Sequence, residues 1–175
     1  MKKKTIVELT NCSVEEYREI KKLPFRVMLD DVRSMQNVGS ILRTCDAFLV
    51  DEVIMAGITG VPPHKEISKT ALGAEDSVAW RYVGDAVEEC FRLKEEGWKI
   101  CVLEQAHGSI DLMDFSYEEG NKYLLVVGNE VKGVDQMIVD MADIILEIPM
   151  HGVKHSLNVA VSAGMAIWKI SSTLD

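Results

Sequence analysis

The sequence predicts one α/β domain in which a mostly parallel sheet is covered by helices on both faces. Short apolar segments typical of strands alternate along the chain with capped or amphipathic segments typical of helices. Several strand segments are continuous apolar runs, which indicates strands buried on both faces. No internal repeat, low-complexity tract or linker divides the 175 residues, a length that suits one domain with a substantial core.

The N-terminal half is predicted to contain two helices and two strands ahead of a loop rich in glycine and proline. Ser13, with Glu16 three residues later, forms a capping-box pattern that opens a charged helix over residues 13–22, and Pro24 is expected to end it. A strand, a helix with apolar residues at helical spacing and a second strand follow, at residues 26–30, 36–48 and 52–56. The loop after the second strand runs to His64.

The C-terminal half continues the alternation of helices and strands. Its expected elements are a helical turn (67–72), a strand (78–83), a helix (85–94), two strands (98–103 and 123–128), a helix (135–141), a strand (144–148) and a last helix (157–170). Asp85 is expected to cap the helix at its start, and Gly97 to terminate it.

The composition favours a soluble cytoplasmic protein. Hydrophobic residues make up 47% and charged residues 27% of the chain, and no apolar run approaches the length that spans a bilayer. The basic start of the chain is followed by Glu8 and Asn11, where a signal peptide would need an apolar stretch. Three cysteines in apolar surroundings, Cys45, Cys90 and Cys101, are expected to be buried reduced thiols.

Charge is unevenly distributed along the chain. Residues 1–26 carry seven Lys or Arg against four Glu, a net charge of +3. Because the whole chain has a net charge of −9, the remaining residues carry −12. We therefore divide the chain into a basic N-terminal helical arm (1–25) and a main domain (26–175). Two interpretations of the arm stay open, an RNA-contacting segment and a solubilising tail.

Polar residues and glycines cluster at three of the predicted strand ends. The first cluster runs from Asp30 to Thr44, the second is residues 128–133, and the third runs from Ile148 to Val159. Because ligands of open α/β sheets bind at the carboxyl ends of strands, these three segments form the candidate site.

Several other chemistries find no support in the sequence. The absence of a GxGxxG or GxxxxGK[ST] loop argues against a nicotinamide or nucleoside-triphosphate enzyme. His151 and His155 flank a glycine in an expected loop without a third ligand nearby, so no metal site is predicted. His64 and Lys65 lie in an expected exposed loop, where RNA phosphate contact and plain solvation are both open.

Taken together, the three segments resemble the three motifs of the SpoU/TrmH family of SPOUT methyltransferases. Residues 37–44 (NVGSILRT) resemble its motif N-x-G-x-x-x-R-T, and residues 128–133 (GNEVKG) resemble its motif G-x-E-x-x-G. The third motif is matched by IPM at 148–150 with SLNV at 156–159. Order and spacing agree, and the resemblance covers residues 26–175; Ala160 departs from the Ser of many members.

The resemblance implies a fold, a cofactor and an assembly. The fold would be an α/β sheet with a C-terminal deep trefoil knot, the cofactor S-adenosyl-L-methionine held largely by backbone groups, and the assembly a homodimer that acts on RNA. Cofactor contacts are expected from Leu103, Glu104, Gly128, Ile148, Met150, Ser156 and Leu157. A side chain at Gly128 is expected to block the pocket.

The resemblance also implies the reaction, methylation of a ribose 2′-hydroxyl, and four catalytic residues: Arg43, Asn37, Glu130 and Asn158. A guanidinium stays protonated at neutral pH, so it cannot accept a proton as a general base. Arg43 is therefore expected to bind a neighbouring phosphate and stabilise negative charge on the 2′-oxygen, while phosphate or water takes the proton. Glu130 is expected to orient Arg43 through an ion pair, and the two asparagines to fix loops or the ribose.

Each of these assignments has a structural alternative. Arg43 would otherwise be a structural residue paired with a carboxylate. Glu130 would cap the following helix, Asn37 would be a cap, and Ser156 and Asn158 would be N-caps of the last helix.

The sequence thus predicts an RNA 2′-O-methyltransferase, with tRNA favoured over ribosomal RNA as its substrate. A non-catalytic RNA-binding or assembly protein of the same fold is the alternative. The chain lacks the long N-terminal RNA-binding domain of some ribosomal-RNA relatives, which favours tRNA. The acidic body argues the other way, or indicates that a dimer concentrates basic charge in one cleft.

Overall fold

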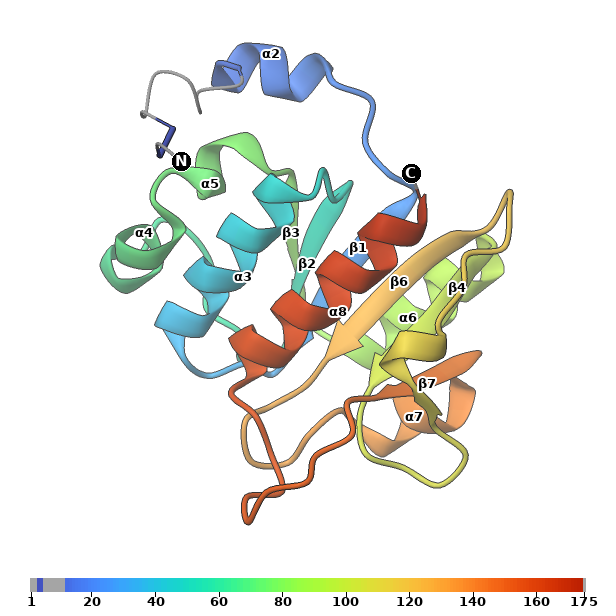
Figure 1. Cartoon of the computed structure of the whole chain (residues 1–175). Helices are drawn as coiled ribbons and strands as arrows, with labels where there is room; N and C mark the ends of the chain where they lie inside the picture. The colour runs from blue at the N-terminus through green and yellow to red at the C-terminus, as the bar shows by residue number, and fades with distance from the viewer. Residues whose placement is uncertain (1–2, 5–11, 175) are drawn as a thin grey trace.

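The computed structural model describes residues 3–4 and 12–174, and it places an all-parallel sheet between two layers of helices (Figure 1). The strand order is β3-β2-β1-β6-β4-β7-β5. The strands are β1 (Phe25–Asp30), β2 (Glu52–Ala56), β3 (Trp80–Val83), β4 (Trp98–Leu103), β5 (Ile110–Asp111), β6 (Lys122–Val127) and β7 (Ile144–Glu147). The predicted α/β class, with its parallel sheet covered on both faces, is confirmed.

The helices are α2 (Val14–Glu19), α3 (Met35–Ala47), α4 (Lys65–Ala71), α5 (Ala74–Ser77), α6 (Ala86–Glu95), α7 (Gln136–Met141) and α8 (Val159–Leu174), with a 3₁₀ turn, η1, at Leu112–Asp114. Asp85 caps α6 by accepting the Glu88 N–H at 3.0 Å, as predicted. Among the described residues, no helix is long and apolar enough to cross a membrane.

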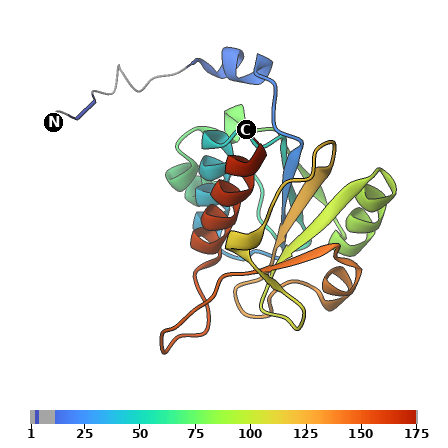
Figure 2. The ribbon, with the colours of Figure 1, turned by 45° about the vertical axis from the view of Figure 1, so that its right-hand side comes forward.

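Successive strand residues point to opposite faces of the sheet and build two separate cores. Val27 and Leu29 of β1 join the core beneath α3, α4 and α8, whereas Met28 joins the core beneath α6 and α7. Figure 2 shows α3 and α8 on one side of the sheet and α6 on the other. Burial on both faces explains why the strands are continuous apolar runs.

The three cysteines expected in apolar surroundings are buried and carry free thiols. Burial raises the pKa of Cys90 and of Cys101 to about 12, so both thiols stay protonated and inert at neutral pH. The prediction of buried reduced thiols is confirmed for these positions.

Some element boundaries differ from the sequence-based expectation. Helix α2 ends at Glu19 rather than before Pro24, because the Ile20 N–H and the Lys22 ammonium both donate to the Tyr17 carbonyl and close the helix. The short elements α5, β5 and η1 were not predicted, since two to four residues carry too little periodicity.

Helix α2 packs against the main domain, although it belongs to the predicted N-terminal arm. Tyr17 is buried, its hydroxyl donates to the Asp46 carbonyl at 3.2 Å, and the Arg18 guanidinium donates to the Asp76 carbonyl at 2.6 Å. Lys2 and Glu8, whose charges enter the arm prediction, and Asn11, which with Glu8 argued against a signal peptide, lie outside the described residues.

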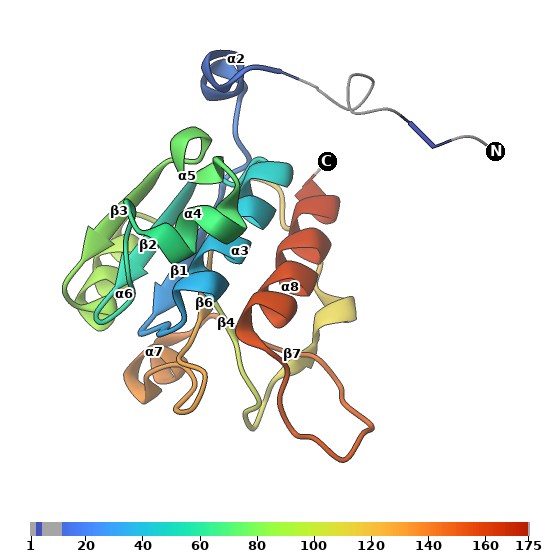
Figure 3. The ribbon, with the colours of Figure 1, turned by 90° about the vertical axis from the view of Figure 1, so that its left-hand side faces the viewer.

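The topology brings the three candidate segments together. Strands β1, β6, β4 and β7 are neighbours, so their carboxyl ends share one edge of the sheet, here called the carboxyl edge. The chain then runs from β7 through the loop of residues 148–158 to α8, which lies beside α3 on the opposite half of the sheet (Figure 3). The trefoil knot stays a prediction.

Candidate functional site

One cavity lies at the carboxyl ends of β4, β6 and β7, and all of the predicted cofactor contacts line it. They are Leu103, Glu104, Gly128, Ile148, Met150, Ser156 and Leu157. Val127 and Leu146 form an apolar floor, and Glu130, Val159 and Ser162 complete the wall towards α8. Residues from three strand ends and one helix start therefore converge on a single volume of about 200 Å³.

The loop of residues 128–134 is closed by its own backbone. Asn129 and Gly133 exchange two backbone hydrogen bonds of 3.0 and 2.9 Å, and the Asn129 side-chain oxygen accepts the N–H groups of Val131 and Lys132. A Cβ at Gly128 would lie 2.3 Å from the Gly133 carbonyl carbon and from the Val134 nitrogen.

The structure gives Gly128 a reason that the sequence did not show. A side chain there would collide with the returning backbone of the same loop. That it would also block the pocket stays a prediction. The glycine allows the loop to close, and the closed loop forms the wall of the cavity.

Glu104 holds this loop from the end of β4. One carboxylate oxygen accepts the Gln105 N–H at 2.8 Å and the other accepts the Val134 N–H at 3.2 Å. Gly133 has a φ of 73° and would place a Cβ 2.2 Å from that carboxylate, which only glycine avoids. Because each carboxylate oxygen accepts more than one hydrogen bond, Glu104 retains acceptor capacity towards the cavity.

A hydrogen-bond network joins all three motif segments. The Asn37 amide donates to the Glu130 carboxylate at 3.0 Å, and the Asn158 amide donates to the Asn37 oxygen at 3.1 Å. Glu130 also accepts the N–H groups of Arg33 and Ser34, each at 3.0 Å. Segments 93 and 121 residues apart in sequence are thus tied together through Glu130, which lines the cavity.

The charge of Glu130 is stabilised by this network. Partial burial raises the pKa of Glu130, but the donated N–H groups of Arg33 and Ser34 and the Asn37 amide outweigh it and hold the pKa below its usual value. The carboxylate is therefore ionised at neutral pH and serves as an acceptor for the start of α3.

Arg43 lies apart from this network, and the expected ion pair with Glu130 is wrong within this chain. Arg43 follows Asn37 by six residues, about 9 Å along the axis of α3. Its exposed side chain lines a second cavity, with Tyr17, Asp46 and Leu72, that shares no residue with the first. None of the ion pairs among residues 3–4 and 12–174 includes Arg43, so the structural alternative of a paired arginine finds no partner there.

The capping alternatives have separate outcomes. Asn158 does cap α8, accepting the Ala160 N–H at 2.9 Å, while its amide reaches Asn37. Ser34 rather than Asn37 caps α3, and Asp135 rather than Glu130 caps α7. Of the four predicted catalytic residues, Asn158 is therefore the one that both caps a helix and bonds to another motif segment.

Sequence reasoning missed two side chains that shape the site. Asn129 is buried, and its amide donates to the Asp31 carbonyl at 2.8 Å, tying the second segment to the first. The Gln105 amide donates to the His155 carbonyl at 2.7 Å and holds the 148–158 loop. Neither has a local pattern that would reveal it, because both partners are distant in sequence.

No grouping of at least three His, Cys, Asp or Glu side chains suitable for a metal ion occurs in the described part of the chain. His64 is the N-cap of α4 and accepts the Glu66 N–H at 3.2 Å.

The profile of the SpoU rRNA Methylase family matches residues 24–168, and the chain belongs to this family. An uncharacterized tRNA/rRNA methyltransferase of Mycoplasma genitalium is 36% identical over 155 residues, 86% of this chain and 63% of that protein. One of Borreliella burgdorferi is 32% identical over 89% of this chain and 67% of that protein. The chain thus spans about two thirds of the length of these curated relatives.

Solved structures of the same kind have the same fold. The TrmH/SpoU tRNA modifying enzyme of A. aeolicus superimposes with a TM-score of 0.81 at 29% identity, covering 91% of this chain and 80% of that one. The AdoMet-bound rRNA methyltransferase of Sinorhizobium meliloti has a TM-score of 0.81 at 26% identity, covering 91% of this chain and 60% of that one.

Proposed function

We propose that this chain transfers a methyl group from S-adenosyl-L-methionine to a ribose 2′-hydroxyl of structured RNA. The observation that carries the proposal is one cavity lined by the second and third motif segments, to which the first segment is tied through Glu130, Asn37 and Asn158. A tRNA is favoured over ribosomal RNA, because the A. aeolicus neighbour named as a tRNA modifying enzyme is matched over 80% of its length.

The cavity suits an adenosyl ligand held mainly by backbone. Leu103, Ile148, Met150 and Leu157 supply apolar surface for a purine, and Glu104 supplies acceptors for ribose hydroxyls. Residues 148–157 join no backbone–backbone hydrogen bond among the described residues, so apart from the His155 carbonyl, which accepts the Gln105 amide, and Pro149, which has no N–H, their backbone groups are available to a ligand. Bound S-adenosyl-L-methionine supplies an electrophilic methyl group on a sulfonium.

Arg43 contributes charge stabilisation in this proposal. Its guanidinium has no ion-pair partner in the described chain and is free to bind the phosphate beside the target ribose. It would stabilise negative charge that develops on the 2′-oxygen, while phosphate or water removes the proton. Glu130 and Asn37 hold the start of α3, on which Arg43 stands.

A homodimer explains why Arg43 and the cofactor cavity lie apart in one chain. Helix α8 exposes an apolar stripe, with Val161, Met165 and Trp168 exposed by 54%, 42% and 54%, and α8 packs beside α3. A second copy on this stripe would bury it and bring its own α3 near the first cavity. Sedimentation of the wild type against Trp168→Glu tests this; a wild-type monomer would contradict it.

The reaction itself is tested by transfer of a radiolabelled methyl group from S-adenosyl-L-methionine to small RNA. The RNA is taken from cells that lack the gene for this protein. Methylation of a 2′-hydroxyl protects the adjacent phosphodiester from alkali, so the label should appear in alkali-resistant dinucleotides. Label in mononucleotides would indicate base methylation instead. Cofactor and RNA binding without any transfer would favour the non-catalytic RNA-binding alternative.

A further inference from the structure

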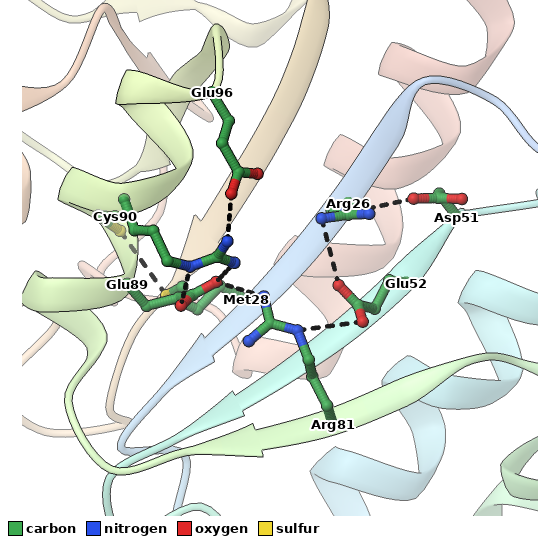
Figure 4. Close-up of polar contacts among 9 residues, drawn as sticks. Arg26, Met28, Asp51, Glu52, Arg81, Glu89, Cys90 and Glu96 are labelled. Atoms are coloured by element: carbon green, nitrogen blue, oxygen red, sulfur yellow. Dashed lines mark hydrogen bonds and ion pairs between the residues drawn. The ribbon is translucent and has the colours of Figure 1, made fainter.

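The cationic side chains of this acidic protein differ in whether they have an ion-pair partner. Three outside the carboxyl edge are partnered, Arg26 with Asp51, Arg81 with Glu89, and Lys94 with Asp143 (Figure 4 shows the first two pairs), whereas Lys99 and Arg43 join no ion pair with a described residue. On the loops and helix starts that follow strands at the carboxyl edge, eight cationic or imidazole side chains donate no hydrogen bond and join no ion pair with any described residue. They are Arg33, His64, Lys65, His107, Lys132, His151, Lys154 and His155.

The acidic side chains of the same edge are engaged by backbone. Asp31 accepts the Ile58 N–H at 2.9 Å, and Asp135 accepts the Met137 N–H at 2.8 Å. Glu104 and Glu130 likewise accept two backbone N–H groups each. Negative charge at this edge is therefore matched by N–H dipoles, whereas the positive side chains extend into solvent.

This arrangement attracts a polyanion locally even though the whole chain has a net charge of −9. An exposed cation without a partner loses no existing ion pair when it binds phosphate, and each such contact also releases counterions. Arg26, Arg81 and Lys94 would have to break their ion pairs first.

We propose that RNA lies across the carboxyl edge with its backbone phosphates on Arg33, Lys132 and Lys154. The inference rests on the proposed function, because it places phosphates around the cofactor cavity. Arg33 precedes the cap of α3 and gives its N–H to Glu130, Lys132 stands in the 128–134 loop, and Lys154 in the 148–158 loop. An RNA strand in contact with all three would run across the 128–134 and 148–158 loops, which line the cofactor cavity.

A third cavity at the same edge provides space for a flanking nucleotide. It has a volume of about 630 Å³, and His107, Lys132, Gln136 and Asp140 supply its polar lining. Its apolar part comes from Val134, Val139 and Ile145. It shares Glu104, Gln105, Val131 and Gly133 with the cofactor cavity, so only the 128–134 loop and Glu104 separate the two.

The test is the salt dependence of RNA binding, measured without cofactor by anisotropy of a short fluorescein-labelled RNA hairpin. The variant Lys132→Gln/Lys154→Gln is compared with Lys94→Gln/Lys99→Gln, which removes the same charge from the amino edge. Loss of two phosphate contacts lowers the slope of log K against log salt by about 1.4–1.8 and weakens binding on the order of tenfold or more near 0.1 M salt.

The control variant is expected to keep the wild-type slope and affinity within about twofold. Arg33→Gln should lower the slope by a further contact, about 0.7–0.9. An unchanged slope in the Lys132/Lys154 variant, or an equal decrease in the control, would overturn the proposal. Cofactor affinity by calorimetry and methyl transfer are recorded separately, so a failure of the proposed reaction leaves this measurement interpretable.

Discussion

Two polar networks of this protein differ in what they connect. The first, here called the ion-pair ladder, comprises Arg26, Asp51, Glu52, Arg81, Glu89, Arg92 and Glu96 and crosses β1, β2, β3 and α6 (Figure 4). The second joins Glu130, Asn37 and Asn158 at the carboxyl edge. The ladder reinforces elements that the sheet already aligns, whereas the second network connects loops to the start of α3 and to α8.

The chemistry of the partners differs accordingly. In the ladder each carboxylate faces guanidinium groups, so positive charge is neutralised inside the fold. At the carboxyl edge the charge of Glu130 is stabilised by neutral N–H groups, which leaves cations free for a ligand. The ladder is also imperfect: the buried Oε2 atom of Glu52 lies 3.4 Å from an Arg26 nitrogen and receives no hydrogen bond.

The largest difference is expected between two arginines. Arg43→Ala should lower the rate of methyl transfer about 10²–10³-fold, as for loss of one charge-stabilising donor. Arg81→Ala should leave the rate of folded enzyme intact and lower the free energy of unfolding by about 1–2 kcal/mol, because Glu52 and Glu89 each lose one of two guanidinium partners. Single-turnover assays and urea unfolding separate the two; wild-type turnover in Arg43→Ala would remove its catalytic role.

The next largest effect is expected from the substitution of one of two glycines, Gly128 and Gly152. Gly128→Ala places a Cβ against the backbone of Gly133 and Val134, so the loop must open and cofactor affinity should fall at least about tenfold, roughly 1.4 kcal/mol. Gly152→Ala is the matched control, since a Cβ there meets nothing within 4 Å. Calorimetric titration with S-adenosyl-L-methionine measures the cofactor affinity of both variants. Equal affinities in the two variants would show that loop closure does not shape the pocket.

Two carboxylates then test the networks directly. Glu89→Gln weakens pairing with Arg81 and Arg92 and should cost about 1–2 kcal/mol of unfolding free energy with turnover retained. Glu130→Gln turns an amide N–H towards backbone N–H donors, so the start of α3 should shift and turnover fall with a smaller stability loss. If Glu89→Gln lowered turnover while Glu130→Gln caused the larger loss of stability, the roles assigned to the two networks would be wrong.

The smallest effect is the acid dependence of stability. Burial raises the pKa of Glu89, but hydrogen bonds from Arg92 and Arg81 outweigh it, so the net pKa lies below the usual value of 4.5. A depressed folded pKa contributes stability that is present above about pH 4.5 and is lost as the pH falls through the folded pKa. Unfolding free energies below pH 4.5 should therefore fall less steeply in Glu89→Gln than in wild type. Parallel curves would exclude Glu89 as a source of acid sensitivity.

Much of the fold was predictable because its signals are local. Strand β2 was predicted over the observed Glu52–Ala56, and β4 over the observed Trp98–Leu103, since continuous apolar runs flanked by glycine leave little choice of register. Asp85 was recognisable as a cap from its position alone. By contrast, α5 depends on the packing of Ala74, and β5 on pairing with β7, which no local pattern records.

The candidate site was predictable in its membership but not in its connections. The motif resemblance placed every expected cofactor contact on one cavity. It assigned Glu130 to Arg43, whereas its partners within this chain are the Asn37 amide and two backbone N–H groups. Such groups are present at every residue, and only the folded path shows which of them are unsatisfied.

The amino-acid sequence by itself determined the α/β class, most strands and helices, the buried thiols and the three segments of the site, because each follows from local periodicity, capping or residue spacing. The tertiary structure alone decided that Gly128 serves loop closure and that Arg43 lies outside the cofactor cavity. It also decided which charges are paired and which remain free at the carboxyl edge. These properties depend on distances between residues remote in sequence, which a chain acquires only when its sheet has formed.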